Sequence, residues 1–513
     1  MRAIKKDGDM VDSAKQTKRS QFIWRIFGAI LVILQAISST ILIISLLNTN
    51  IFSSIIVILV VAILILLLMF NIYKLIFKKE ILVSTKVVCT LIAIFCTILS
   101  IFAFRYTDSI NGFLSKITDK KPETKEYSVI VEKNSGITGI SDLNNKSVGF
   151  LESDPKATNA EQHLSNIIKI KSDYYGDIDT LLGALSSTIT DSIVLETDRY
   201  IAVGEESNEL IDNFEVIYTF EIELDSEIVA SSNKEVTSEP FIVYISGSDS
   251  RVGIKATARS DVNILAVINP KVGKILLVSI PRDTYVQLHD TTGLKDKLTH
   301  AGIYGINMSK TTIEDFLNIR IDHTIKVGFE AVVRVVDELD GIDIVSDRAM
   351  KLRASNTNNQ KICEYIEGKQ HVDGDCALRF ARERKSYERG DRHRGENQQQ
   401  VISSVVERLT SSKDYLLKTP AILDAAADLF ETSFERDDIT AFIRMQLANP
   451  IKWNIESISI DGVGSMLPTY SMGANRPLYV MIPNDDSMAT ATQKIKQYLE
   501  EDLEESTEEQ KDE

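Results

Sequence analysis

The sequence predicts an α/β protein in which three membrane-spanning helices precede a small α/β domain and a larger α/β sandwich. Three observations predict this order. Long apolar runs occupy the first hundred residues, short strand-like and helix-like patterns alternate after them, and apolar strands in the second half lie beside charged side chains. With 513 residues and 44% apolar content, the chain is long enough for two or three domains with packed cores.

The N-terminal region resembles a membrane anchor. Residues 1–20 are basic, and residues 21–110 contain three apolar runs, at 26–47, 51–70 and 87–104. A helix of about 20 apolar residues is long enough to cross a bilayer. A cleaved signal peptide would instead have one shorter run before small residues.

Positive charges set the expected orientation of this anchor. Seven lysines and arginines precede the first run and four lie between the second and third, whereas the link at residues 47–50 has none. Positively charged flanks remain in the cytoplasm. We therefore expect a multi-pass protein of the cell membrane, with a cytoplasmic N-terminus and extracellular domains after Arg105.

The net charge of the chain does not point to a particular class of binding partner. Half of the net charge of −16 comes from residues 500–513, where nine acids and one lysine give −8, so this tail is predicted to be disordered. No basic stripe with interleaved aromatic residues occurs, which argues against nucleic-acid binding.

The chain has four cysteines, of which Cys89 and Cys96 fall in the third apolar run. Cys363 and Cys376 lie in the expected extracellular part, where a disulfide is chemically allowed, and the sequence leaves open whether they are bonded.

Residues 116–233 are predicted to form a small extracellular α/β accessory domain. Strand patterns at 127–131, 146–150 and 192–195 alternate with an amphipathic stretch at 178–185. The polar stretch 230–240 separates this domain from the next one. Nothing in the residues shows what the accessory domain does.

The main domain is predicted at residues 240–499, as an α/β sandwich with a mainly central sheet. Apolar strands at 241–245, 262–268 and 275–280 are each expected to finish beside aspartates or arginines, which suggests one charged site at one edge of a sheet. The other expected elements are a loop at 284–306, helices at 310–317 (with Ser309 as N-cap), 329–339, 375–380, 391–410, 419–429 and 439–447, strands at 323–327, 342–345 and 455–460, and a final helix before the tail.

Two clusters of charged residues carry the candidate chemistry. The first contains Asp249, Arg259, Asp261 and Arg282. In the second, Arg382 and Arg384 point to the same side if the chain is extended after residue 381, and Asp391, Arg394 and Gln398 share one helix face through their spacing of three and four.

Arginine forks bind phosphate oxygens in pairs, and magnesium favours carboxylates together with phosphate oxygens. The clusters therefore indicate a pyrophosphate site with a divalent cation. The alternative, that these residues are solvated or form structural ion pairs, stays open for each one taken singly.

At this level of detail the chain resembles the LytR-CpsA-Psr family, and its three spans and accessory domain resemble the capsule-associated CpsA branch. The resemblance covers residues 241–406 and rests on GSDSR at 247–251, ARSD at 258–261, SIPRDT at 279–284 and RER at 382–384, followed by Asp391, Arg394 and Gln398.

The resemblance implies an α/β/α sandwich that holds a polyprenyl chain in an apolar cavity and its pyrophosphate among arginines. It also implies transfer of a lipid-linked glycopolymer, here a capsular polysaccharide, to peptidoglycan. Matched position by position, the magnesium-associated residues are Asp249 and Asp261, the catalytic residues are Asp391 (candidate general base), Arg282 and Asp261, and the pyrophosphate-binding residues are Arg259, Arg282, Arg382, Arg384, Arg394 and Gln398.

The chain departs from the family pattern in one loop. In KLTHA at 297–301, Thr299 stands where the family usually has asparagine, and Gly302 and an isolated Gly305 replace a Gly-Gly pair.

Three functions are compatible with these residues: the transferase, a lipid-pyrophosphate hydrolase that uses water as acceptor, and a non-catalytic sensor or regulator of capsule assembly. The paired carboxylates favour an enzyme, because phosphoryl transfer depends on positioning and charge neutralisation. Expected partners are the polyprenyl-pyrophosphate-linked polysaccharide, peptidoglycan, the membrane and capsule export or assembly proteins.

Overall fold

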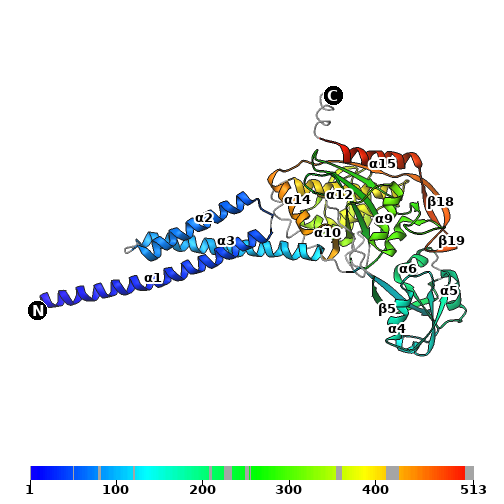
Figure 1. Ribbon diagram of the computed structural model, residues 1–513, viewed down its shortest axis with the longest axis horizontal. Helices are drawn as coiled ribbons and strands as arrows, with labels where there is room; N and C mark the ends of the chain where they lie inside the picture. The colour runs from blue at the N-terminus through cyan, green and yellow to red at the C-terminus, as the bar shows by residue number, and fades with distance from the viewer. Residues whose placement is uncertain are drawn as a thin grey trace, which may run out of the picture. The chain divides into compact units, whose positions relative to one another are not determined.

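The computed structural model describes residues 2–49, 51–78, 82–118, 122–206, 211–224, 234–248, 254, 256–353, 361–411 and 427–502. The chain forms two compact units (Figure 1). One contains Met1–Ser115 with Ile439–Asn449, and the other contains Lys116–Asp438 with Pro450–Glu513. The predicted disordered tail falls almost entirely outside the described residues.

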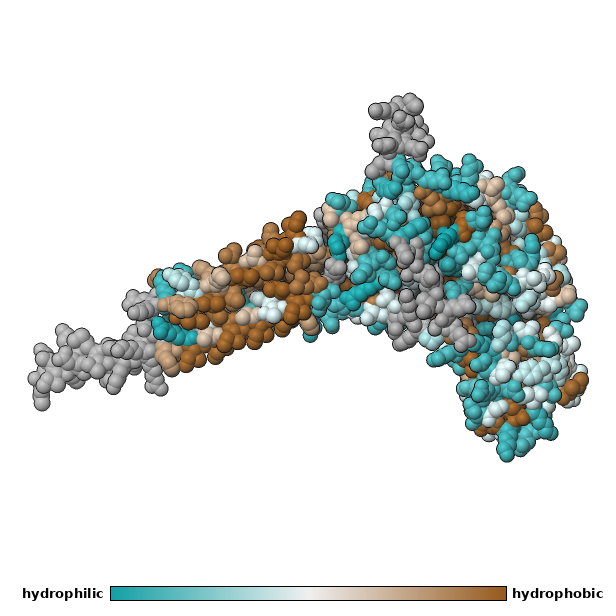
Figure 2. All heavy atoms as spheres, viewed as in Figure 1, coloured by the Kyte–Doolittle hydropathy of each residue, from teal (hydrophilic) through white to brown (hydrophobic). Residues whose placement is uncertain are grey.

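Three long helices make up most of the first unit: α1 (Arg2–Thr49), α2 (Ser54–Ile72), which continues into a π-helical turn η1 (Tyr73–Phe77), and α3 (Val83–Thr118). All three are long and apolar enough to span a membrane, over Phe22–Asn48, Ser54–Phe77 and Val83–Thr118. The prediction of three apolar helices is confirmed, and hydrophobic residues make up most of the visible surface of their apolar spans (Figure 2).

Polar side chains in these helices face one another. The Asn71 side chain donates to Gln35 Oε1 at 2.7 Å and to the Cys89 carbonyl at 3.3 Å, and both amide side chains are buried. In lipid, where water is absent, such internal bonds satisfy polar groups and hold helices together.

The second unit begins with an α/β region, residues 122–224, which we call the accessory region. Its five strands, β1 (Thr124–Glu132), β2 (Lys146–Leu151), β3 (Ile170–Tyr175), β4 (Ser192–Glu196) and β5 (Phe214–Glu223), form one sheet in the order β3-β2-β4-β1-β5. Strand β2 pairs parallel with β3 and β4, and β1 pairs antiparallel with β4 and β5. Helices α4 (Ala157–Ser165), α5 (Ile178–Ser186) and α6 (Thr197–Glu206) pack on this sheet.

The second sheet has six strands in the order β16-β11-β6-β7-β8-β17. Its centre is the antiparallel trio predicted from the sequence, β6 (Phe241–Ser248), β7 (Val262–Asn269) and β8 (Lys274–Ser279). Strands β11 (His323–Gly328) and β17 (Asn454–Ser459) run parallel to their neighbours β6 and β8, and β16 (Phe430–Thr432) runs antiparallel to β11.

Helices cover both faces of this sheet, which gives the predicted α/β/α layers. On one face, Leu276 and Val278 of β8 pack with apolar residues of α9 (Ile306–Leu317) and α15 (Asp485–Glu500). Leu277 points the other way because strand side chains alternate. On that face, Gln399 of α12 (Asp391–Thr410) donates to the Leu277 carbonyl at 2.9 Å.

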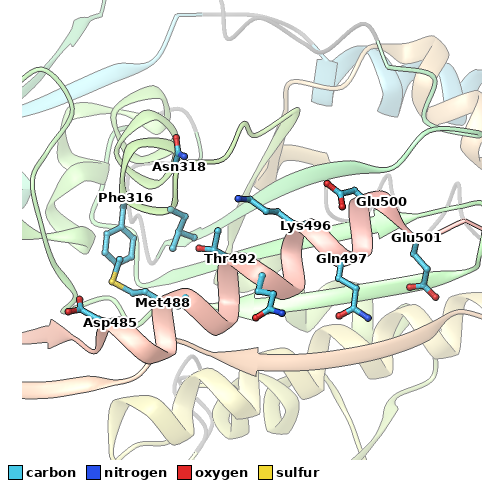
Figure 3. A pocket seen from close by; sticks show the side chains of 12 residues that line it. Phe316, Asn318, Asp485, Met488, Thr492, Lys496, Gln497, Glu500 and Glu501 are labelled. Carbon is cyan, nitrogen blue, oxygen red and sulfur yellow. The ribbon is translucent and has the colours of Figure 1, made fainter. Parts of the chain in front are cut away.

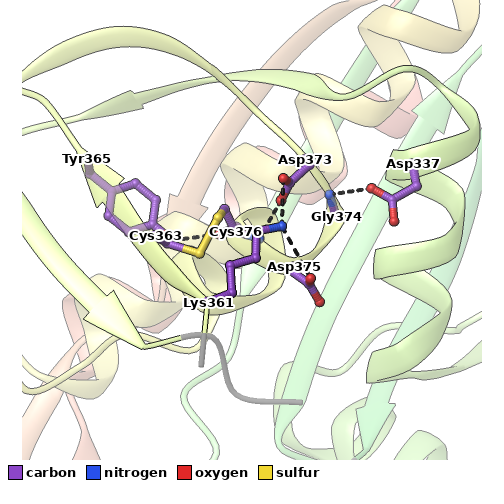
Figure 4. The surroundings of a disulfide bond; sticks show 8 residues. All are labelled: Asp337, Lys361, Cys363, Tyr365, Asp373, Gly374, Asp375 and Cys376. Atoms are coloured by element: carbon purple, nitrogen blue, oxygen red, sulfur yellow. Dashed lines mark hydrogen bonds and ion pairs between the residues drawn. A yellow bond between two sulfur atoms is a disulfide. The ribbon is translucent and has the colours of Figure 1, made fainter. Parts of the chain in front are cut away.

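Around α12, a second core joins α10 (Phe329–Glu338), α11 (Gly374–Ala381) and two ribbons, β12 (Ile342–Ser346) with β15 (Gly368–Val372) and β13 (Met350–Arg353) with β14 (Ile362–Tyr365). Cys363 of β14 and Cys376 of α11 form a disulfide (Figure 4). Tyr365 reinforces the link by donating to the Cys376 carbonyl at 2.7 Å. The sequence left open whether Cys363 and Cys376 are bonded, and the structure shows that they are.

A long hairpin, β18 (Gly462–Thr469) and β19 (Gly473–Pro483), reaches the accessory region. Met472 and Leu478 are buried in the accessory core beside α5, and Arg476 forms an ion pair with Asp179 of that helix. The sequence did not predict this hairpin.

Three predictions about the elements are wrong or lie outside the described residues. The loop at 284–306 contains the short strands β9 (Tyr285–Val286) and β10 (Asp296–Lys297) and helical turns α8 (Leu298–Ala301) and η3 (Gly302–Tyr304). Helix α9 starts at Ile306 with Gly305 as N-cap, so Ser309 is a buried helical residue and not a cap. Of the predicted helix 419–429, residues 419–426 are outside the description, and Ala427–Leu429 form a 3₁₀ turn. Helix α14 spans Arg436–Ala448.

Candidate active site

The predicted charged site lies where β6 and β8 end and β7 begins. Gly247 pairs with Val262, and Ile264 pairs with Ser279, so the three strands share this end of the sheet. The Asp261 amide donates to the Gly247 carbonyl at 2.8 Å and fixes the chain before β7. One detail of the prediction is wrong: because β7 is antiparallel, it brings Arg259 and Asp261 to the site through its start and not through its end.

Arg282 is held directly after β8 by two carboxylates. Its Nη1 lies 2.7 Å from Asp261 Oδ1, and its Nε lies 3.8 Å from Asp283 Oδ2. Burial alone would lower the pKa of Arg282, but the Asp261 and Asp283 carboxylates raise it above its ordinary value. Arg282 therefore stays charged, and its guanidinium bridges the residues that follow β8 and those that precede β7.

The first turns of α12 contribute Asp391, Arg394 and Gln398. Arg394 Nη2 lies 2.8 Å from Asp391 Oδ1, as their spacing on one helix face predicts. The close approach of α12 to β8 requires Gly395, since a β-carbon there would lie 2.6 Å from the Ser279 hydroxyl. Arg394 and Gln398 are both buried.

Burial is the largest cause of the pKa shifts of both Asp391 and Arg394. Burial raises the pKa of Asp391, with Arg394 and Arg282 opposing the rise and Asp283 adding to it. Burial likewise lowers the pKa of Arg394, while Asp391 acts in the opposite direction. A buried carboxylate beside arginines, with its pKa raised above the ordinary value, is a candidate proton acceptor.

The sequence predicts Arg382 and Arg384 on the same side on the condition that the chain is extended after residue 381, and the structure does not meet this condition at Arg382. Arg382 is in the α-helical region and its amide still bonds to the Leu378 carbonyl, so α11 continues for one more residue. The Arg382 guanidinium lies over the Phe329 ring, 4.8 Å from its centroid. Arg384 is exposed, and its charge contributes to lowering the pKa of Asp391, which places it at the same site.

The segment that carries Arg259 is fixed from two sides. The Ser260 amide donates to the Thr299 carbonyl at 3.1 Å, and the Thr299 amide donates to the Arg282 carbonyl at 2.8 Å. Gly302 lies against this crossing, since a β-carbon there would be 2.4 Å from the Ala258 carbonyl oxygen. The loop that departs from the family pattern therefore supports the site through its backbone.

The other side of this segment contacts the accessory region. The Thr257 amide donates to the Thr124 carbonyl of β1 at 2.7 Å. Glu123 forms a 2.9 Å ion pair with Lys326 of β11, whose ammonium group also donates to the Ala256 carbonyl at 3.0 Å. The backbone two residues before Arg259 is thus continuous with the accessory sheet.

Two residues near the site had no recognisable signal in the sequence. Lys297 is buried, with its Nζ 3.4 Å from Asp283 Oδ1. Asp198, at the start of α6 in the accessory region, has its pKa raised to about 6 by burial, with Arg259 opposing the rise and Asp261 adding to it. The accessory region therefore contributes a carboxylate to the electrostatics of the site.

A model of the LytR_cpsA_psr family matches residues 212–494, more than half of the chain. The chain belongs to the LytR-CpsA-Psr family. The match begins within the accessory region, just before β5, and includes all the site residues predicted from the sequence, whereas Asp198 precedes it.

Two relatives of this chain are named as transferases. The "polyisoprenyl-teichoic acid–peptidoglycan teichoic acid transferase TagU" of Halalkalibacterium halodurans is 31% identical over 264 residues, 51% of this chain and 80% of the relative. The correspondingly named TagV of Bacillus subtilis is 30% identical over 271 residues, 52% of this chain and 66% of the relative. The crystal structure of B. subtilis TagV superimposes with a TM-score of 0.43 at 28% identity, covering 51% of this chain and 98% of that one.

For the magnesium ion expected from the family resemblance, the described part of the chain offers Asp261. Asp249, the second predicted ligand, lies outside the described residues. No group of three or more His, Cys, Asp or Glu that could hold a metal occurs within the described ranges. One carboxylate beside the arginines that are expected to bind phosphate suits a cation that is bound together with pyrophosphate, since magnesium commonly takes one or two carboxylates plus phosphate oxygens.

A separate groove of about 800 Å³ runs between α9 and α15 (Figure 3). Phe316 and Met488 lie close together at one end, and Lys496 and Glu500 line it further along. None of the predicted site residues lines this groove, and its mixed lining does not match the apolar cavity expected for a polyprenyl chain. The location of that cavity stays a prediction.

Proposed function

We propose that this protein transfers a glycopolymer from a polyprenyl-pyrophosphate carrier to peptidoglycan, outside the cell membrane. The observation that carries the proposal is the convergence of Arg282, Arg394 and Asp391 at one end of the sheet, within the family-matched segment. The named activity of the relatives provides the reaction class. The three apolar helices would anchor the protein, with the positively charged N-terminus in the cytoplasm.

In the proposed reaction, the arginines bind and orient the pyrophosphate. A hydroxyl oxygen of the acceptor attacks the phosphorus atom that carries the sugar, and the hydroxyl proton passes to Asp391. The bond between that phosphorus and the bridging oxygen breaks, and polyprenyl phosphate leaves with the bridging oxygen. The product is a phosphodiester between the glycopolymer and the acceptor.

The charges of the site suit this step. Phosphoryl transfer proceeds mainly through positioning and charge stabilisation, and buried arginines provide both. Arg282 is already oriented by Asp261 and Asp283, so little reorganisation is needed when the pyrophosphate binds. Asp261 and Asp249 are the residues that would hold magnesium, and the ion would neutralise part of the negative charge of the pyrophosphate.

We further propose that the polymer is a capsular polysaccharide. This part of the proposal rests on the three apolar helices and the accessory region that precede most of the family-matched segment. Those features resemble the capsule-associated branch of the family.

The proposal can be tested with the full-length protein in lipid nanodiscs. The protein would be mixed with a polyprenyl-pyrophosphate-linked oligosaccharide, peptidoglycan glycan strands and magnesium, and the products separated by mass. We expect a saccharide–peptidoglycan conjugate that is absent with chelator and in Asp391→Asn and Arg282→Ala variants. Free sugar phosphate without conjugate would instead support the hydrolase, and lipid binding without any product would support the sensor.

A further inference from the structure

A pocket of about 450 Å³ opens beside Asp391, and neither Arg282 nor Asp261 lines it. Its volume lies within the range of about 300–1,000 Å³ typical of small-molecule sites. The walls come from three parts of the chain that are distant in sequence: Pro281 and Asp283 after β8, the segment that leads into α12, with Arg384, Arg389 and Arg392, and strand β19, with Tyr479 and Met481. Asp391 belongs both to this pocket and to the arginine cluster of the site.

Tyr479 provides a fixed aromatic surface in this pocket. Its side chain lies against Gly464 on the neighbouring strand, since a β-carbon at Gly464 would come within 2.7–3.1 Å of two ring carbons and the hydroxyl oxygen of Tyr479. Gly464 is the diagonal cross-strand neighbour of Tyr479, because Gly464 pairs with Met481. One side of the ring is thus covered by backbone, while the residue remains 50% exposed.

The arginines around the pocket differ in how they are held. Arg392 donates to the Gly462 carbonyl at 2.7 Å and forms an ion pair with Asp461, so it ties α12 to the start of β18. Arg389 pairs with Glu396 at 2.6 Å but remains half exposed, and Arg384 is exposed. The exposed arginines can donate hydrogen bonds to hydroxyl, acetamido or carboxylate oxygens.

This combination of groups fits an amino-sugar glycan. The C–H face of a pyranose ring packs on an aromatic face, and the ring oxygens then remain available for hydrogen bonds at the edges. A sugar stacked on Tyr479 would have its hydroxyl groups close to Asp391, which is the candidate proton acceptor.

We propose that the pocket between Tyr479 and Asp391 is the subsite for the acceptor, a β-1,4-linked N-acetylhexosamine strand of peptidoglycan. This inference rests on the proposed function and adds which surface binds the second substrate. The donor pyrophosphate and the acceptor sugar then lie on opposite sides of Asp391. The alternative source of a sugar in this pocket is the donor polymer itself, and the test below separates the two.

The test uses full-length protein in nanodiscs and measures the KM of each substrate separately. In Tyr479→Ala we expect the KM for glycan strands to rise about tenfold, while the KM for the lipid-linked donor changes less than about twofold. Tyr479→Phe keeps the ring and should stay close to the wild type. Val463→Ala is the matched control, because Val463 is exposed on the opposite face of the same hairpin.

Two results would overturn the inference. An unchanged acceptor KM in Tyr479→Ala would show that the pocket does not bind the acceptor, and a raised donor KM would assign it to the donor polymer. Equal melting temperatures of the three variants would exclude unfolding as the cause.

A binding measurement separates this inference from the proposed function. A tetramer of β-1,4-linked N-acetylglucosamine would be titrated calorimetrically into the full-length protein without donor. Binding that is lost in Tyr479→Ala supports the subsite even where no conjugate forms. Absence of binding together with normal conjugate formation would refute the subsite and leave the transferase standing.

Discussion

Arg199 of the accessory region donates a 2.9 Å hydrogen bond to the hydroxyl of Tyr304, which lies 105 residues further along the chain. Glu196 accepts from Lys125 at 2.7 Å and lies 3.4 Å from Arg199 Nε. The three charged side chains of this cluster are at most 5% exposed. Two ion pairs and a phenol thus connect the accessory sheet to the loop that supports Arg259.

Removing Arg199 should destabilise the second unit. Arg199→Met leaves Glu196 with one counterion in a buried setting, and we expect a loss of about 3 kcal/mol in the free energy of unfolding. Tyr304→Phe removes a single hydrogen bond and should cost about 1–2 kcal/mol. Denaturant titration of the two variants checks this order. Equal stability of Arg199→Met and the wild type would contradict a structural role for the cluster.

Asp391 should control the acidic side of the pH–rate profile. Because burial raises its pKa, the proton acceptor becomes protonated at a higher pH than an ordinary aspartate. We expect kcat/KM to fall on acidification with an apparent pKa above about 3.9, the ordinary value for aspartate. Asp391→Asn should lower kcat by about 10²–10⁴-fold and remove this acidic limb. A profile unchanged in shape in Asp391→Asn would assign the proton transfer to another group.

Asp198 should make donor binding dependent on pH. Its pKa of about 6 means that it is charged at pH 7.5 and mostly neutral at pH 5. The charged carboxylate competes with pyrophosphate for the field of Arg259, so we expect the donor to bind more tightly as the pH falls through 6. Asp198→Asn should bind the donor with little change between pH 5 and 7.5. Calorimetric titration with the lipid-linked donor at both pH values measures the difference, and a parallel pH response in both proteins would refute it.

His323 should make the protein less stable in acid. Its ring is fully buried and stacks on Phe434 with centroids 3.9 Å apart, and burial lowers its pKa to about 4. The unfolded chain, with an ordinary histidine pKa of about 6.5, therefore binds the proton more readily between pH 6.5 and 4. The free energy of unfolding should decrease by about 3 kcal/mol as the pH falls across this window. His323→Phe should lose this part of the slope, and an identical slope in both proteins would contradict the assignment.

The Cys363–Cys376 disulfide should stabilise the start of α11, the helix whose other end leads into Arg382 and Arg384. The cysteines are 13 residues apart, and closing a loop of this length stabilises a protein by about 2–3 kcal/mol. We expect the double variant Cys363→Ser, Cys376→Ser to lose about this amount, measured by thermal unfolding. Reductant should lower the melting temperature of the wild type but not that of the double variant, whose membrane cysteines Cys89 and Cys96 are unchanged.

The central sheet could be predicted from the sequence because its strands are continuous apolar runs rich in β-branched residues, as at 241–245 and 275–280. The hairpin β18–β19 could not. Its strands contain Gly464 and Pro468, and exposed and buried residues are mixed along them. Its stability comes from tertiary contacts, such as Leu478 in the accessory core, which no local pattern shows.

The sequence also predicted part of the candidate site. The pairing of Asp391 with Arg394 follows from helix geometry alone, and the structure shows it. The conformation of Arg382 was mispredicted because α11 retains a helical hydrogen bond at that residue. Asp198 is an ordinary acidic residue in the first turn of a helix, and only the docking of the accessory region brings it near Arg259.

The position of Leu478 next to Tyr479 limits how this protein can be recombined with its relatives. Leu478 is buried in the accessory core, and Tyr479, the following residue, lines the pocket beside Asp391. A graft that replaces only the accessory region would leave Met472 and Leu478 without their apolar partners and would loosen the strand that carries Tyr479. Working chimeras should therefore exchange residues 122–224 and 462–483 as one module, although more than 200 residues separate the two segments in the gene product.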